Sequence, residues 1–275
     1  MRRTIAAIIT IAAAVGFAST ASAADLPFKA PMRQMAPLAL TNWSGWYVGA
    51  NAGYSWGRSA VDYSQDPGLF FGSPPFGAGG SLSPDLSPKS FIGGGQFGFN
   101  YQSGVLVYGL ETDFAWRNRT DSFVAVLNSS NDTLTLTDEQ NWVGTLRGRI
   151  GLSPATMNNW LFYVTGGLAY GRFEHSFTQF CNVDCNQIRT LSDSVTKAGW
   201  TVGGGIEIAL DRNWSVGAEY LYMNFGNDAL SAPAAGPLPL FAFQLSLPNT
   251  SASFQDTSQV ARLKLNYRFG DAGFY

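Results

Sequence analysis

Charge, histidine, cysteine and long apolar runs are all scarce in this sequence. Charged residues make up 13% of the 275 positions, with 17 basic and 19 acidic side chains, one histidine and two cysteines. Soluble domains carry about 25% charged residues, so a typical cytosolic globule is excluded. The slight acidic excess gives nucleic-acid binding no electrostatic basis. Beyond the N-terminus no stretch approaches the roughly 18 consecutive apolar residues of a membrane-spanning helix, which excludes a helical membrane protein.

The N-terminus has the features of an export signal. Arg2 and Arg3 precede an apolar run that ends at Phe17, and the small residues of Ala21-Ser22-Ala23 follow. Signal peptidase accepts this arrangement. We therefore predict a signal peptide over residues 1–23, cleaved after Ala23.

The sequence after the predicted signal peptide falls into two parts. Residues 24–42 contain three prolines and no usable periodicity, which is typical of a flexible periplasmic segment. From Trp43 onward the pattern changes, so we expect one barrel domain at residues 43–275.

Eight segments of this domain alternate between apolar residues and small or polar ones. In the first, Trp46–Trp56, every even position is apolar or aromatic, whereas Gly49, Asn51, Gly53 and Ser55 lie on the other face. The other seven are Phe91–Tyr101, Leu106–Trp116, Trp142–Leu152, Trp160–Arg172, Ala198–Ile208, Trp214–Tyr222 and Ala261–Phe269. A period of two indicates a strand with two different faces. About 9 to 11 residues is the length that crosses a bilayer as a tilted strand, so together the segments predict a transmembrane β-barrel.

The connections between the eight segments alternate in length. Residues 102–105, 154–159 and 211–213 are short, whereas residues 58–89, 118–140, 174–196 and 227–257 are long. Outer-membrane barrels have this asymmetry, with short periplasmic turns and long extracellular loops. We therefore expect an all-β, eight-stranded antiparallel up-and-down barrel in the outer membrane of a Gram-negative cell. Two further alternating runs, Thr133–Thr137 and Phe241–Leu247, are expected to extend strands beyond the membrane.

Seven of the eight tryptophans fall at the ends of the predicted strands. With a periplasmic N-terminus, the periplasmic ends carry Trp46, Trp160 and Trp214, and the outer ends carry Trp56, Trp116, Trp142 and Trp200. Indole favours the membrane interface because its ring is apolar and its N–H group needs a partner. The positions predict a girdle at each edge of the membrane.

Nearly all the charge on the predicted strands falls at inward-facing positions. The set comprises Glu111, Asp113, Glu207 and Glu219 together with Arg147, Arg149, Arg262, Lys264 and Arg268. The interior of an eight-stranded barrel is only wide enough for side chains to fill it. The favoured interpretation is therefore a static plug of paired charges. The alternative is a gated ion path that opens when the charges exchange partners.

The third long loop contains both cysteines and the histidine. Cys181 and Cys185 are candidates for a small disulfide, because export places them in an oxidising compartment. Two thiols cannot complete a structural zinc site and His175 is the sole histidine, so we predict no metal site. A lipid-modifying serine enzyme would need His175 beside Ser176, but neighbouring residues on a strand point to opposite faces. We therefore predict neither catalysis nor a cofactor.

Several segments carry a family resemblance. They are the ADLP after the signal peptide, WSGWYVGANAGYSWG, TLRGRIGL, FYVTGGLAYG, VGAEYLYMNFG and the closing LKLNYRFG. These segments resemble the small outer-membrane barrel proteins of alphaproteobacteria, the RopB group, over essentially the whole barrel. The resemblance implies an OmpA-like eight-stranded barrel and surface antigen, with a role in envelope integrity and surface interaction.

The resemblance also implies partners. The alternating aromatics of Tyr267-Arg268-Phe269 resemble the final-strand signal read by the barrel-assembly machinery. Some relatives bind haemin, so haemin or a host or surface ligand at the loops stays an alternative, as does a narrow pore. The main expectation is a non-enzymatic barrel in contact with the outer-membrane bilayer and lipopolysaccharide.

Overall fold

The fold is taken from a computed structural model, which describes residues 41–66, 80–126, 133–181, 187–232, 235–238, 245–247 and 249–269. The chain divides into two units, Met1–Ala39 and Leu40–Tyr275, and all described residues belong to the second. The predicted signal peptide and residues 24–40 therefore lie outside the described part.

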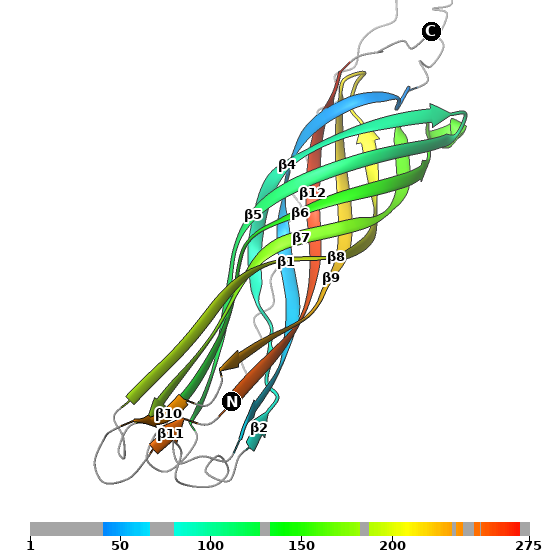
Figure 1. Cartoon of the computed structure of the whole chain (residues 1–275). Helices are drawn as coiled ribbons and strands as arrows, with labels where there is room; N and C mark the ends of the chain where they lie inside the picture. The colour runs from blue at the N-terminus through cyan, green and yellow to red at the C-terminus, as the bar shows by residue number, and fades with distance from the viewer. Residues whose placement is uncertain are drawn as a thin grey trace, which may run out of the picture. The chain divides into compact units, whose positions relative to one another are not determined.

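Eight long antiparallel strands form a closed ring (Figure 1). They are β1 (Gly45–Gln65), β4 (Lys89–Ser103), β5 (Leu106–Val126), β6 (Thr133–Leu152), β7 (Trp160–Cys181), β8 (Gln187–Ala209), β9 (Trp214–Ala232) and β12 (Thr250–Arg268). Each strand pairs with the next along the chain, and β12 pairs with β1 to complete the ring. The predicted eight-stranded antiparallel barrel is confirmed.

Shorter elements lie in the connections. β2 (Gly80–Leu82) and β3 (Asp85–Leu86) pair with β1, and β10 (Ala235–Leu238) pairs with β11 (Leu245–Leu247) in a separate two-stranded sheet. The helix η1 (Ala155–Met157) is a single 3-10 turn between β6 and β7. Among the described residues no helix is long and apolar enough to cross a membrane.

The strands are longer than the sequence predicts. Most of the predicted long loops 58–89, 118–140, 174–196 and 227–257 is strand in the structure, so those loop bounds are wrong. The predicted strand extension at Thr133–Thr137 is confirmed, since these residues begin β6. The extension predicted at Phe241–Leu247 is wrong for its described part, because Leu245–Leu247 forms β11.

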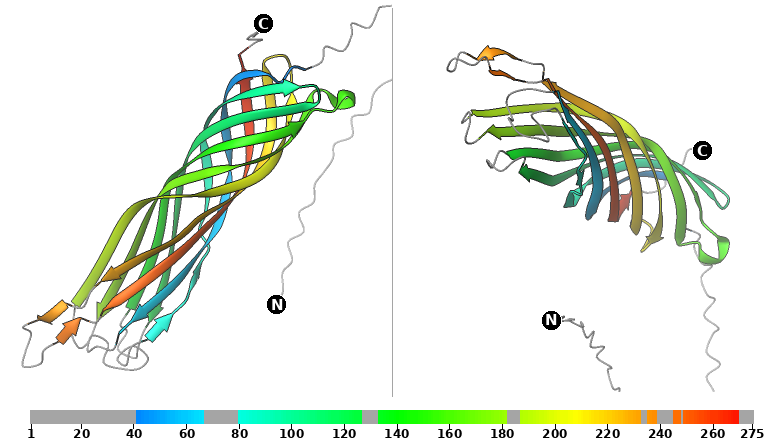
Figure 2. Two further views of the ribbon diagram at one scale, coloured as in Figure 1. Left: turned by 45° about the vertical axis from the view of Figure 1, so that its right-hand side comes forward. Right: turned by 90° about the horizontal axis from the view of Figure 1, so that it is seen from below.

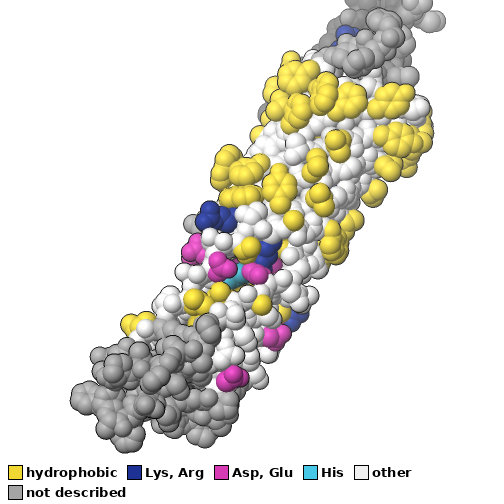
Figure 3. All heavy atoms as spheres, viewed as in Figure 1, with side chains coloured by type: hydrophobic (Ala, Val, Ile, Leu, Met, Phe, Trp, Pro, Cys, Tyr) yellow, Lys and Arg dark blue, Asp and Glu magenta, His cyan; other side chains and the backbone are white. Residues whose placement is uncertain are grey.

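Half of the barrel wall is apolar on its outer side. Phe91 is 80% exposed, Trp116 65% and Val164 66%; Val164 lies near the turn end of β7, Trp116 at the middle of β5, and Phe91 beside Tyr54 near the middle of β1. Figure 3 shows hydrophobic side chains gathered over the half of the visible face that carries the short turns. Charged side chains gather around the middle and toward the loops. An apolar surface of this kind is stable only in lipid, so the short-turn half is the membrane-spanning part.

The barrel interior is stacked in layers. From the short turns outward, the periplasmic layer holds Trp43, Val107, Leu161 and Tyr163. The lower charge layer holds Glu111, Asp113, Arg147, Arg149, Glu207, Glu219, Arg262 and Lys264. An apolar septum follows, with Ile92, Ala115, Val143, Ala169, Phe173, Leu221, Met223, Phe225 and Val260. The upper charge layer holds Arg117, Arg119, Asp138, His175, Lys197 and Asp256, and the outer apolar layer holds Val61, Tyr63, Leu86, Leu134, Leu136, Phe177, Ala252 and Phe254.

The wall of the barrel separates between β8 and β9. Their register begins at Ala209 with Ser215 and ends at Trp200 with Asn224. Beyond this point, in the described part of both strands, β8 pairs with β7 and β9 pairs with β12. Figures 1 and 2 show the two strands diverging toward the loops. We call this unpaired stretch the seam; it comprises residues 187–199 of β8 and residues 225–232 of β9.

Two adjacent glycines of β4 test how tightly the wall is built. A Cβ added at Gly94 would lie 2.0 Å from the carbonyl oxygen of Phe114, whereas at Gly93 the nearest atom would be 3.9 Å away. The Gly94→Val variant should therefore convert from the compact, fast-migrating form to the unfolded form at a lower temperature on a gel, because β4 and β5 can no longer approach. The Gly93→Val variant should convert at the wild-type temperature. Equal conversion temperatures for the two variants would contradict this packing.

Candidate functional site

The lower charge layer is built by alternate residues of five strands. Glu111 and Asp113 project inward from β5, Arg147 and Arg149 from β6, and Glu207 from β8; Glu219 of β9 and Arg262 and Lys264 of β12 complete the set. Strand alternation dictates this placement, because residues two apart share a face. Eight of the nine predicted interior charges are thus brought together, and all eight side chains are buried.

Arg147 and Arg262 lie at the centre of this layer. Arg147 contacts Glu111 at 2.5 Å, Asp113 at 2.8 Å and Glu219 at 3.0 Å. Arg262 contacts Asp113 at 2.8 Å and Glu219 at 2.6 Å. A guanidinium presents five donors in a fixed plane, so it can bind several carboxylates at once. The two arginines join three acids into one network.

Lys264 and Arg149 extend the network. The Lys264 ammonium lies 2.6 Å from one oxygen of Glu111 and 2.8 Å from the other. Arg149 lies 3.3 Å from Glu207 and 3.6 Å from Glu111. The eight side chains therefore carry four negative and four positive charges. Buried charges are stable only when they are paired and hydrogen-bonded in this way.

Neutral side chains add hydrogen bonds to three of the acids. Tyr47 donates to Glu111 at 2.6 Å, Tyr163 donates to Glu219 at 3.0 Å, and Ser215 donates to Glu207 at 2.5 Å. The guanidinium of Arg149 also stacks between the rings of Tyr47 and Tyr163, at 4.9 and 5.1 Å from their centres. The sequence predictions do not include either tyrosine, although the odd positions of both residues place them on the inward face of β1 and β7.

Arg268 does not join this layer. Its guanidinium lies over the ring of Trp43 at 4.7 Å and donates to the backbone oxygen of Asn42 at 2.9 Å, at the short-turn end of the barrel. The Trp43 indole in turn donates to Ser153 at 3.1 Å. The prediction of one nine-member cluster is corrected here, because Arg268 is the last residue of β12 and lies too far along the strand to reach the acids.

The tryptophans lie where strand parity places them. Trp46, Trp160 and Trp214 are first or second in strands that begin at the short-turn end, and Trp116 pairs directly with Trp142 across β5 and β6. The outer set, Trp56, Trp116, Trp142 and Trp200, lies in mid-strand because the strands continue beyond it. Trp43, the eighth tryptophan, is fully buried inside the barrel.

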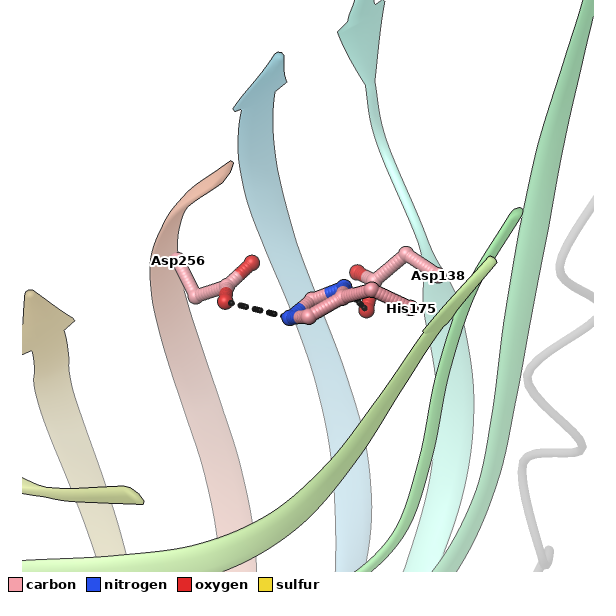
Figure 4. A group of neighbouring side chains, drawn as sticks. All are labelled: Asp138, His175 and Asp256. Atoms are coloured by element: carbon pink, nitrogen blue, oxygen red, sulfur yellow. Dashed lines mark ion pairs between the residues drawn. The ribbon is translucent and has the colours of Figure 1, made fainter. Parts of the chain in front are cut away.

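The upper charge layer lies on the loop side of the outer tryptophans and was not predicted. His175 is 2% exposed on β7, inside the barrel, and not in the predicted loop. Its Nδ1 faces Asp138 Oδ1 of β6 at 3.4 Å and its Nε2 faces Asp256 Oδ2 of β12 at 3.4 Å, as Figure 4 shows. Ser176 lies on the other face of the same strand, as alternation requires.

Lys197 of β8 fixes the tautomer of the histidine. Its ammonium lies 3.1 Å from His175 Nε2 and 2.8 Å from Asp256 Oδ2. An ammonium can only donate, so Nε2 accepts and the ring proton is on Nδ1, toward Asp138. The ring is held further by stacking on Phe254, with the centres 4.2 Å apart.

The two carboxyl groups that flank the histidine differ in acidity. Burial and the charge of Asp256 raise the pKa of Asp138 to about 6, and the cations nearby only partly oppose this. Burial would also raise the pKa of Asp256, but His175 and Lys197 beside it lower the pKa of that carboxyl below its usual range. Asp138 is therefore the carboxyl that accepts a proton first as the pH falls.

The predicted disulfide cannot be followed in the structure. The side chain of Cys181 and the whole of Cys185 lie outside the described residues. The aromatic part of the predicted loop at residues 67–79 lies outside them as well.

Comparison with known proteins identifies the family. The model of the "Outer membrane protein beta-barrel domain" family matches residues 10–269. The chain belongs to this family of outer-membrane β-barrels. The predicted localisation in the outer membrane is thereby confirmed.

Two relatives support the resemblance to alphaproteobacterial barrels. The chain is 33% identical to the "31 kDa outer-membrane immunogenic protein" of Brucella melitensis over 265 residues, which is 95% of this chain and 99% of the relative. It is 30% identical to the "22 kDa outer membrane protein" of Rhizobium leguminosarum over 184 residues, covering 67% and 65% of the two chains. The predicted membership among small alphaproteobacterial outer-membrane proteins is confirmed.

A solved outer-membrane protein is similar in structure. The outer membrane protein OprG from Pseudomonas aeruginosa matches 84% of this chain and 99% of its own, with a TM-score of 0.47 and 13% identity.

The network of the lower charge layer predicts a large stability loss when one central charge is removed. The Arg147→Ala variant leaves three buried acids short of a partner, and breaking such a pair costs about 3 to 5 kcal/mol. The measurement is the free energy of unfolding by urea of the barrel in lipid vesicles. Arg58 is the control: its pair with Asp85 is 66% and 50% exposed, so Arg58→Ala should leave the free energy of unfolding nearly unchanged. Equal losses in the two variants would contradict the network.

The acidity of Asp138 predicts a pH dependence of stability. Its pKa in the folded chain, about 6, is above the ordinary carboxyl value of 3.8. The free energy of folding contributed by protonated Asp138 is therefore fully present below pH 3.8 and is lost as the pH rises through about 6. Each unit of difference is worth about 1.4 kcal/mol. Between pH 5 and pH 7.5, in buffer with chelator, the wild type should lose stability that the Asp138→Asn variant retains. The exposed Asp62→Asn variant should follow the wild type, and parallel curves for all three proteins would disprove the assignment.

Proposed function

We propose that this outer-membrane barrel is a non-enzymatic protein that supports envelope integrity and surface contact, and that its interior is closed to ions. The observation that carries the proposal is the complete pairing of the lower charge layer, in which four acids and four bases occupy the membrane-spanning part of the lumen. In a barrel of this width, side chains so arranged leave no continuous water path.

The apolar septum supports the same proposal. Phe173 and Phe225 meet there with ring centres 4.8 Å apart, within a cluster of buried apolar residues, and Lys197 lies 5.1 Å from the centre of the Phe173 ring at the border with the upper charge layer. An ion that passed the lower charge layer would have to cross this layer without hydration, which costs several kcal/mol. The septum and the charge layer therefore act as two closures in series.

The geometry of His175 argues against an acyl-transfer role. A serine nucleophile needs an imidazole within hydrogen-bond reach. Ser176 points away from His175, and the Nε2 atom that a serine would use accepts from Lys197 at 3.1 Å. The buried position of His175 also gives no support to haemin ligation by this residue at the cell surface.

Exposed cations beside the outer tryptophans favour lipopolysaccharide as a partner. Trp56 pairs with Lys89 across β1 and β4, and Trp142 pairs with Arg172 across β6 and β7. Both cations are exposed at the level of the outer tryptophans, where basic side chains attract anionic head groups. Beyond this level the strands continue outward and raise the loops above the membrane surface, which suits contact with other surfaces.

The final strand supports recognition by the barrel-assembly machinery. Tyr267 and Phe269 are both exposed on the lipid side, and the centres of their rings lie 5.5 Å apart. Phe274 and Tyr275 follow in the sequence, so Phe269 and these two aromatics are the candidates for the recognised end.

Planar bilayer recordings test the closed interior. The wild type should give no reproducible single-channel current. Neither Arg147→Ala nor Phe173→Ala should open a path alone, because each leaves the other closure intact, whereas the double variant should conduct. The lipid-facing Leu168→Ala variant, 60% exposed, is the control, and each protein is first checked for the heat-sensitive gel shift of a folded barrel. A stable current from the wild type would replace this proposal with a narrow pore.

A further inference from the structure

Three side chains, His175 and Asp256 of the upper charge layer and Asp228 of the seam, surround one point inside the barrel. At that point lies the ammonium of Lys197, 2.8 Å from Asp256 Oδ2, 3.1 Å from His175 Nε2 and 3.5 Å from Asp228 Oδ2. These atoms come from three strands, β12, β7 and β9, which converge there although they are far apart in the sequence. One imidazole nitrogen and two carboxylates form a donor set that binds divalent transition metals.

The spacing of the donor atoms suits a metal ion. His175 Nε2 and Asp256 Oδ2 are 3.4 Å apart, and two ligands of a tetrahedral zinc ion, each about 2.1 Å from it, lie about 3.4 Å apart. Asp138, His175 and Asp256 each offer an atom within 4.8 Å of the other two, and all three residues are buried.

An unsatisfied carboxylate provides independent support. Asp138 is 1% exposed, yet neither of its oxygens has a hydrogen-bond partner among the described residues; its charged neighbours are His175 Nδ1 at 3.4 Å and Arg119 at 3.8 Å. Leaving the oxygens of a buried carboxylate without hydrogen bonds is costly. In metal sites the ligating histidine donates its second ring N–H to a carboxylate, which orients the ring and makes it a better ligand. Asp138 occupies this position (Figure 4).

The seam provides a route to the point that Lys197 occupies. Lys197 and Asp228 face each other across it, from the unpaired parts of β8 and β9. The Asp228 side chain is 33% exposed, whereas that of Lys197 is 6% exposed. The lysine therefore lies between the outer solution and His175, and withdrawal through the seam would carry its charge into water.

We propose that His175, Asp256 and Asp228 bind a divalent transition-metal ion such as Zn²⁺, with Asp138 as the orienting carboxylate and Lys197 as the cation that leaves when the metal enters. The exchange makes the local charge one unit more positive: Lys197 leaves one of the two carboxylate charges uncompensated, whereas the divalent ion neutralises both, and the protonated lysine moves to solvent. The histidine keeps its Nδ1 proton and ligates through Nε2. Calcium and magnesium, which prefer all-oxygen sites, should bind poorly.

Isothermal titration of the EDTA-treated full chain in detergent micelles with ZnCl₂ tests the site. The wild type should bind one ion per chain at pH 7.5. His175→Ala and Asp256→Asn should lose binding, and Asp138→Asn should weaken it by about 10- to 100-fold, as orienting residues do. Lys197→Met should bind more tightly than the wild type, a result that a merely structural role for these residues does not produce.

Matched controls make the outcome decisive. Ser176→Ala changes the other face of β7, and Asp193→Asn removes an exposed carboxylate of β8 that pairs in register with His175. Both should bind Zn²⁺ as the wild type does, and every variant is first checked for the heat-sensitive gel shift. The proposal is overturned if the wild type binds no Zn²⁺, if binding survives in His175→Ala, or if CaCl₂ gives the same titration.

Discussion

Closure of the backbone hydrogen bonds inside lipid is the constraint on which the rest of this structure depends. Hydrocarbon offers no partners for N–H and C=O groups, so every strand must pair on both sides wherever lipid surrounds it. The register of β8 with β9 obeys this limit: it runs from the short turn to Trp200 and ends there. Trp200 belongs to the outer set of tryptophans, so the seam begins where the lipid ends. Beyond that level water satisfies the free strand edges.

The same closure dictates what fills the lumen. Alternation sends every second side chain inward, and a ring of eight strands has room for those side chains and little else. The lower charge layer meets the requirement by pairing Arg147 and Arg262 with three acids, so that paired charges fill this level of the lumen. Replacing such a cluster with apolar residues of equal volume is often neutral in stability. The presence of a charged cluster in this layer therefore fits a role in closing the lumen to ions better than a role in stabilising the fold.

The sequence was sufficient for the membrane-spanning part because lipid imposes a simple pattern there. Apolar and polar positions alternate strictly between Trp46 and Trp56, and such alternation identified the strand, its two faces and the interior charges. Beyond the outer tryptophans both faces of a strand meet water or a mixed interior, so apolar and polar residues alternate less clearly. The strands predicted from the sequence are therefore shorter than those in the structure. For this reason the sequence pattern places His175 in a loop and does not predict the upper charge layer. The separation of β8 from β9 is a property of strand pairing, which one strand's pattern does not encode.

The two charge layers look alike in composition but differ in what their position permits. In the lower layer, Glu111 and Glu219 are surrounded by lipid-covered wall and lie between the periplasmic layer and the septum, so their partners cannot leave without an uncompensated charge. In the upper layer, Lys197 has Asp228 and the seam beside it, so its charge can move to water at low cost. The seam beside Lys197 therefore separates an exchangeable network from a fixed one. The buried histidine lies in the layer where exchange is physically allowed, which is where a dissociable cation can be bound and released.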